Sequence, residues 1–207
     1  MDIETNIKLF ESEMAKIDKN SRPGIDALMD YIRNSDMYTA PSSTRFHLSV
    51  KGGLLQHSLN VLKVLRSLLH DNGDGTYSYL VCGEDLGDAY KIPEESVIII
   101  ALLHDICKTR FYKEEERWRK DENGQWERYN TYSIDDKSPL GHGEKSALMV
   151  QQFMPLKPVE LYAIRWHMGF SDDNTNTFSK AVDMFPIIWA VHSADMMATH
   201  FMENVIS

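Results

Sequence analysis

Six residues of metal-ligand type are spread along this chain, and several stand in apolar surroundings. They are His57, His104, Asp105, His142, His167 and Asp195. Imidazole nitrogen and carboxylate oxygen are ligands that borderline transition metals accept. Asp105 follows closely on the seven-residue apolar run 97–103, and burying an ionised carboxylate there is costly unless a cation or hydrogen bonds compensate it. Taken as a set, the six residues predict a buried metal site.

Each of these residues taken alone has a simpler explanation. His57 would lie on the buried face of its helix, where a hydrogen-bonded core histidine is common. His104 and Asp105 would then face a wet crevice at a helix end. His167 stands in a last helical turn, where the helix dipole favours histidine without any metal. Asp195 is harder to explain in this way, because aspartate has poor helix propensity and the surrounding segment is apolar.

The hydrophobic spacing predicts that helices position these residues. Apolar residues recur at three- and four-residue intervals over residues 3–17, from 25 onward, and over 54–70, 93–107, 143–154, 158–168 and 184–204. Three segments lack this spacing: we expect loops at 38–51 and 171–177, and irregular structure at 76–92. The predicted fold is mostly α, a compact helical bundle. It forms a single domain over 1–207, with an N-terminal helical extension (1–45) and a metal-binding core (52–204).

One insertion, at about residues 110–134, breaks the helical pattern. Aromatic residues flank Asn123-Gly124, which predicts a β-hairpin with a two-residue turn. Six basic and six acidic residues balance its charge, so the hairpin is not expected to clamp nucleic acid. Two roles are open for its aromatic side chains: they cover a bound base, or they pack one face of the hairpin on the helices.

Composition narrows the class of protein. The 207 residues include 22 Lys and Arg against 31 Asp and Glu, a net charge of −9, so we expect no long nucleic acid as a partner. The longest apolar run falls far short of the ~20 residues that cross a bilayer, and the acidic N-terminus is unlike a secretory signal. We therefore expect a soluble, cytoplasmic protein with no membrane partner. Cys82 and Cys107 are too few for a disulfide scaffold and are expected to be small core residues.

Four short motifs in this chain resemble the HD superfamily of metal-dependent phosphohydrolases. Residues 52–59 (GGLLQHSL) are similar to the segment leading into the first ligand helix of that family, and residues 104–108 (HDICK) to its His-Asp-x-x-Lys motif. Residues 141–143 (GHG) and 164–167 (IRWH) are similar to the extra ligand segments of members that hold two metals. No tandem His-His or Gly-Tyr-Pro triplet accompanies His167, which argues against an HD-GYP cyclic-dinucleotide phosphodiesterase. The motifs are most similar to the HD domain of bacterial 3′–5′ exoribonucleases, although the nucleic-acid-binding module of those enzymes is missing from this sequence.

The resemblance implies a ligand set. His57, His104, Asp105 and Asp195 would surround a first ion, and His142 and His167 would hold a second, with Asp105 bridging the two. Adjacent side chains on a helix point roughly 100° apart, which would let Asp105 bridge rather than duplicate its neighbour. One or two divalent transition-metal ions are expected, with Fe or Mn favoured and Mg, Ni, Zn or Co as alternatives.

The resemblance also implies a mechanism and its residues. The ions would activate a hydroxide for in-line attack on phosphorus, with Asp105 and Lys108 as the catalytic residues. Lys108 would bind a phosphate oxygen, and Arg110 and Arg45 are secondary candidates for the same contact. Two further histidines, His47 and His192, are expected to be structural, although His192 is placed to orient a ligand.

The expected function is hydrolysis of a phosphomonoester or phosphodiester in a nucleotide or small phosphorylated metabolite. Two other functions remain open. One is a non-catalytic HD module that binds metal or nucleotide for regulation, and the other is a nuclease on short single-stranded nucleic acid. The sequence leaves the oligomeric state open.

Overall fold

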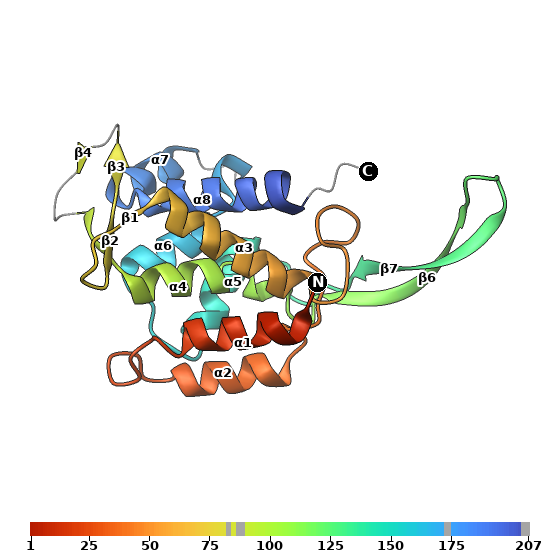
Figure 1. Ribbon diagram of the computed structural model, residues 1–207, viewed down its shortest axis with the longest axis horizontal. Coiled ribbons are helices and arrows are strands. Elements are labelled where there is room, and N and C mark those ends of the chain that lie inside the picture. The colour runs from red at the N-terminus through yellow and green to blue at the C-terminus, as the bar shows by residue number, and fades with distance from the viewer. Residues whose placement is uncertain (82–83, 86–89, 172–174, 204–207) are drawn as a thin grey trace.

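The computed structural model describes residues 1–81, 84–85, 90–171 and 175–203 of the chain, and helices dominate it (Figure 1). The helices are α1 (Ile3–Met14), α2 (Ile25–Asn34), α3 (Gly53–Leu68), α4 (Glu94–Leu103), α5 (His142–Gln151), α6 (Pro158–Trp166), α7 (Thr175–Met184) and α8 (Ile187–Met197). Short 3-10 turns span Ile106–Lys108 and Gly169–Ser171, and a π-helix, Ala198–Glu203, continues α8. The expected mostly α fold is confirmed.

Helix α4 is the centre of the hydrophobic core. Every residue from Ser96 to Leu103 is buried, because this helix is apolar on all sides. It packs against α3, α6 and α1, and lies between α3 and the α1–α2 pair in Figure 1. The buried helix therefore delivers the residues that follow it, His104 and Asp105, to the middle of the molecule.

In the described part of the chain, the strands form two small antiparallel sheets and a longer hairpin. Strands β1 (His70–Asp71), β2 (Thr76–Ser78) and β5 (Ile92–Pro93) pair in the order β1-β2-β5, and β3 (Leu80–Val81) pairs with β4 (Glu84–Asp85). The expectation of irregular structure over 76–92 was therefore wrong for the strand residues. These strands are two or three residues long, and tertiary pairing rather than a local alternating pattern determines them.

Helix α7 was missed, and several predicted helix ends were wrong. The sequence predicts a loop over 171–177 and one helix over 184–204. In the structure, α7 begins at Thr175, and α8 begins only after Pro186. The prediction missed α7 because most of its residues are polar; among its described side chains, the buried ones are Phe178 and Ala181, one turn apart. Near the N-terminus, α1 ends at Met14 rather than at residue 17.

Strands β6 (Tyr112–Lys120) and β7 (Trp126–Ile134) form the predicted hairpin, a long curved ribbon that projects from the helices (Figure 1). Residues 121–125 connect the strands, because Lys120 pairs with Trp126, so the expected two-residue turn was wrong. Gly124 in this connection is left-handed, with φ of 76°. Trp118 and Trp126 are 57% and 64% exposed, so of the two roles left open for the hairpin aromatics, packing on the helices does not hold for these two.

The base of the hairpin, by contrast, is anchored. Phe111 is buried, and the Tyr112 hydroxyl donates a hydrogen bond of 3.0 Å to the Ser42 carbonyl. Ser42 belongs to the loop that leads into α3. A side chain at Gly53 would place its Cβ 2.0 Å from the Leu48 carbonyl oxygen, so glycine is required for this loop to pack on the start of α3.

None of the helices in the described residues has both the length and the apolar character that a bilayer crossing requires.

Candidate metal centre

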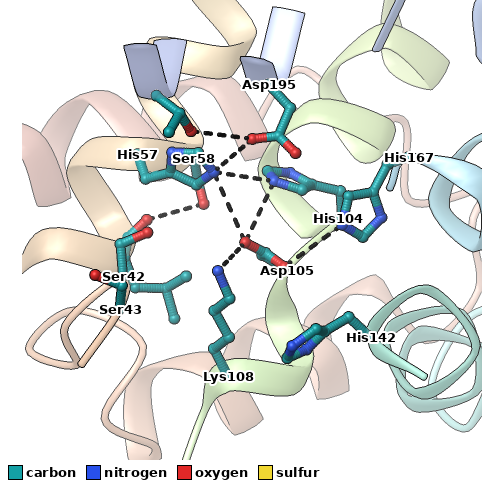
Figure 2. A network of polar contacts seen from close by, with 12 residues as sticks. Ser42, Ser43, His57, Ser58, His104, Asp105, Lys108, His142, His167 and Asp195 are labelled. Carbon is teal, nitrogen blue, oxygen red and sulfur yellow. Dashed lines mark hydrogen bonds and ion pairs between the residues drawn. The ribbon is translucent and has the colours of Figure 1, made fainter. Parts of the chain in front are cut away.

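Four segments bring histidine and aspartate side chains together in the buried interior. His57 comes from α3, His104 and Asp105 follow α4, His167 follows α6, and Asp195 lies on α8. Figure 2 shows these side chains pointing toward one another. The His57 Nε2 atom lies 3.3 Å from His104 Nε2 and 3.3 Å from an Asp195 oxygen. Asp105 lies 3.5 Å from His104 Nε2 and 3.6 Å from His167 Nε2.

Each of the three imidazole rings uses its other nitrogen to bind an acceptor. Both His104 and His167 cap their helices and donate from Nδ1 to the carbonyl three residues earlier, at 2.8 Å. His57 donates from Nδ1 to the Glu203 carboxylate, at 3.0 Å and 3.1 Å. Since a neutral imidazole has one donor and one acceptor nitrogen, these contacts turn the Nε2 lone pairs toward the cluster.

The donor set fits a transition-metal ion. Among the described residues, His167 Nε2 is buried without a hydrogen-bond partner, and 3.6 Å to Asp105 exceeds hydrogen-bonding distance. The ligand atoms of His57, His104 and Asp195 lie within 4.8 Å of one another, and so do those of His104, Asp105 and His167. Imidazole and carboxylate donors buried at this spacing are the ligands that Fe, Mn and Zn accept.

Burial and neighbouring charges set the protonation of this cluster. Burial lowers the pKa of His104 to about 4, so its ring is neutral at pH 7. Burial also opposes charging of His57, but hydrogen bonds to Asp195 and Glu203 outweigh it and raise the pKa of His57 to about 9. Metal binding through His57 Nε2 would therefore release a proton.

The two aspartates are ionised despite their burial. Desolvation works to raise the pKa of Asp105, but the charge of Lys108 together with the interactions with His104 and His167 outweighs it and holds that pKa well below its usual range. For Asp195, desolvation is likewise outweighed by hydrogen bonding to His57 together with the charges of His57, His104 and His167, which lower the pKa. The site thus presents two anionic carboxylates to a cation.

The geometry of Asp105 differs from the helical expectation. The α4 helix ends at Leu103, and Asp105 has φ of −111° and ψ of 17°, outside the helical region. The expectation that Asp105 follows His104 within one helix was therefore wrong. The following 3-10 turn brings Lys108 Nζ to 2.6 Å from Asp105 Oδ2, and Lys108 reaches Asp105 from the side opposite Asp195 in Figure 2.

His142 stands apart from the other five residues, at the start of α5 (Figure 2). Its Nδ1 lies 3.4 Å from the Cys107 thiol, and its ring packs edge-on against Phe111. Ligand atoms of His142, Cys107 and Asp105 lie within 4.8 Å of one another, so Asp105 belongs to this group and to the group with His104 and His167. Burial raises the pKa of Cys107 to about 12, which keeps it a thiol.

A close helix contact brings His142 toward this site. A Cβ on Gly143 would lie 1.9 Å from the Arg165 carbonyl oxygen, so glycine lets α5 approach α6. A cavity of about 350 Å³ adjoins His142 and is lined by residues 141–144, Arg165, Trp166, Met168 and Gly169.

The two arginines expected near a phosphate lie elsewhere. Arg45 is exposed, and its guanidinium lies over the Phe46 ring. Arg110 bonds to the Asn34 carbonyl. The structure therefore brings Lys108, and neither arginine, to the cluster.

Sequence reasoning missed Glu203. This buried carboxylate accepts hydrogen bonds from His57 and from Asn60, whose Nδ2 lies 2.9 Å away. The available signal was its spacing, because Glu203 and Thr199 follow Asp195 by eight and four residues and so share its helix face.

The remaining histidines and cysteine have separate places. His192 Nδ1 lies 2.8 Å from the carbonyl of His167, so it contacts the backbone of a predicted ligand. His47 lies 3.0 Å from the Ser42 hydroxyl and 4.0 Å from Glu203. Cys107 is buried as expected, whereas Cys82 lies outside the described residues.

Comparison with known families decides the classification. The family model for the HD domain matches residues 54–188, about two thirds of the chain. The chain belongs to the HD domain family. The HD domain match spans His57, His104, Asp105, His142 and His167, and ends seven residues before Asp195. HD domains belong to a superfamily of metal-dependent phosphohydrolases, which agrees with the donor set described above.

Two further comparisons found no relative. Neither the curated proteins nor the solved structures contain a match to this chain.

Proposed function

We propose that this HD domain protein hydrolyses a phosphomonoester or phosphodiester of a nucleotide or small phosphorylated metabolite. The observation that carries the proposal is the convergence of three imidazole Nε2 atoms and two ionised carboxylates in the buried interior, with the Lys108 ammonium beside them. Similarity of residues 52–59 to the HD domain of exoribonucleases favours a phosphodiester substrate.

The residues divide between two ion positions. His57, His104, Asp105 and Asp195 would hold one ion, and His142 and His167 would hold another together with Asp105. Bound divalent ions lower the pKa of coordinated water and neutralise phosphate oxygens, which is the chemistry that phosphoester hydrolysis needs. Iron or manganese suits this set of donors.

Lys108 and the cavity next to His142 would provide a positive charge and a space for the substrate. Lys108 Nζ is largely buried beside Asp105, so its positive charge is weakly screened and attracts a phosphate group. The cavity next to His142 has the volume of a small-ligand site, and Gly141 and Gly143 are among its lining residues.

Elemental analysis of protein purified without chelators tests the metal site. We expect about two transition-metal ions per chain, falling to about one in His142→Ala. His70→Ala is the matched control, because His70 is exposed on β1 and should leave the metal content unchanged. One ion in both the wild type and His142→Ala would contradict the second ion position.

A screen of phosphomonoesters and phosphodiesters then tests catalysis. Hydrolysis that depends on iron or manganese and is lost in Asp105→Asn supports the proposal. Full metal content without hydrolysis of any substrate would favour the regulatory module instead. Failure to bind metal, even after reconstitution with iron or manganese, would overturn the proposal that this protein is a hydrolase.

A further inference from the structure

One face of the β6–β7 ribbon carries both exposed hairpin tryptophans. Directly opposed residues of an antiparallel pair project to the same side, and side chains alternate along each strand. The register therefore places five cross-strand pairs on this face: Tyr112 with Ile134, Glu114 with Tyr132, Glu116 with Asn130, Trp118 with Arg128, and Lys120 with Trp126. We call these ten residues the tryptophan face.

The tryptophan face is unusually apolar for a surface in water. Trp118, Trp126 and Ile134 are 57%, 64% and 61% exposed. An isolated two-stranded hairpin is marginally stable unless something packs against it. Arg128 lies 5.0 Å from the Trp118 ring and Lys120 lies 5.6 Å from the Trp126 ring, so these cations cover part of each indole and leave the rest in solvent.

Charge is divided along the same face. The half near the turn carries the cations Lys120 and Arg128 beside the two tryptophans, whereas the half near the base carries the anion Glu114 beside Tyr132 and Ile134. Glu116, at the central pair, lies 3.4 Å from Arg128 of the same chain, and Tyr112 is held against Ser42 at the base. Each half therefore complements the other in sign and in apolar content.

We propose that the tryptophan face is an interface between two copies of this chain, with the hairpins packed face to face and antiparallel. A two-fold axis at the central Glu116–Asn130 pair brings the turn half of each ribbon onto the base half of the other. Trp126 then packs near Ile134 of the second copy, and Arg128 lies beside its Glu114 and Tyr132. The surface is self-complementary only in this antiparallel arrangement.

Charge balance favours a second copy over single-stranded nucleic acid. The aromatic and cationic half would suit stacked bases, but the anionic half of the same face would repel a phosphate backbone. Over the whole chain the net charge is −9, which adds to that repulsion.

The size of the face predicts a weak dimer. Nine residues at about 3.3 Å each give a ribbon about 30 Å long and about 10 Å wide, roughly 300 Å² of flat area per copy. The two copies together would bury roughly 600 Å², which is below the size of stable specific interfaces, so the dimer should be weak and should depend on protein concentration.

Sedimentation velocity of the full chain between about 1 and about 100 µM tests the interface. We expect a reversible dimer whose Kd rises with salt concentration. Arg128→Glu and Glu114→Arg should each raise the dimer Kd at least about tenfold, because each places like charges together at two symmetric positions. The double variant with both substitutions should restore dimerisation.

Lys113→Glu is the matched control. Lys113 is exposed on the opposite face of the same ribbon, and its substitution makes the same charge change as Arg128→Glu. Its dimer Kd should stay within about twofold of wild type. Circular dichroism and metal content of every variant would establish that the helical body is intact.

Three outcomes would overturn the interface. They are a wild type that stays monomeric throughout, a double variant as weak as either single variant, and a dimer that none of the substitutions affects. If a monomeric wild type instead binds a short oligonucleotide with quenching of tryptophan fluorescence that Trp118→Ser and Trp126→Ser abolish, the face binds nucleic acid.

Discussion

The metal cluster and the hairpin both contain many charged side chains, but burial makes their interactions differ in strength. Lys108 and Asp105 are 2.6 Å apart with side chains 12% and 4% exposed, whereas Arg128 and Glu116 are 3.4 Å apart and each 65% exposed. An exposed ion pair gains little because water and salt screen it, while a buried charge that loses its partner is costly. Charges in the cluster can therefore hold and orient an ion, and those on the hairpin are suited to selecting a partner.

Removing a buried carboxylate should have the largest effect. Asp105→Asn keeps the shape of the side chain but removes its negative charge. Asp105 belongs to both groups of possible ligands, the one with His104 and His167 and the one with His142. We expect loss of bound metal and at least about a thousandfold lower hydrolysis, measured by elemental analysis and initial rates. Glu114→Gln makes the same chemical change on the hairpin and should leave both quantities unchanged. An active, metal-loaded Asp105→Asn would show that Asp105 is not a ligand.

Core packing provides the next contrast. Ile99 is fully buried in α4, and Ile134 is exposed at the hairpin base. Ile99→Ala should lower the free energy of unfolding by about 2–5 kcal/mol, because it leaves a cavity in the core. Ile134→Ala should change it by less than about 0.5 kcal/mol in dilute protein. Urea unfolding followed by circular dichroism measures both, and equal effects would contradict the contrast.

The smallest effect is expected from Glu203, which touches the predicted ligand His57 rather than a metal. Glu203→Gln should lower metal affinity about 10- to about 100-fold, since the carboxylate orients His57 and increases its basicity. Titration with cobalt(II), followed by visible absorption, measures the affinity. Glu122→Gln, at the exposed hairpin turn, is the control. Unchanged cobalt affinity would limit Glu203 to a structural role.

The same two regions show what the sequence can predict. The apolar run of α4 and the Asn123-Gly124 pair are strong local signals, and the helix and the hairpin that they predict were confirmed, although the connection between the strands is longer than two residues. The six ligand candidates were also identifiable from residue type, spacing and family resemblance. Residue type and spacing indicate metal-binding chemistry even before the fold is known.

Other features depend on contacts that no local pattern encodes. Glu203 reaches His57 because the π-helix continues the face of α8 that carries Asp195, across 146 positions of sequence. The conformation of Asp105 follows from where α4 ends, a boundary that an unbroken apolar pattern does not mark. The short strands around β2 form only when their partners are already in place.

The anchored base of the hairpin has a mechanical consequence. On one side Phe111 packs against the His142 ring, and on the other Tyr112 is hydrogen-bonded to Ser42, whose hydroxyl contacts His47. The ribbon is thus a lever about 30 Å long whose base is held by one contact to His142 and by another to the loop that carries Ser42 and His47. A force applied near the tryptophans would act at the base as a smaller displacement with a larger force, and would fall first on the contacts that Phe111 and Tyr112 make there.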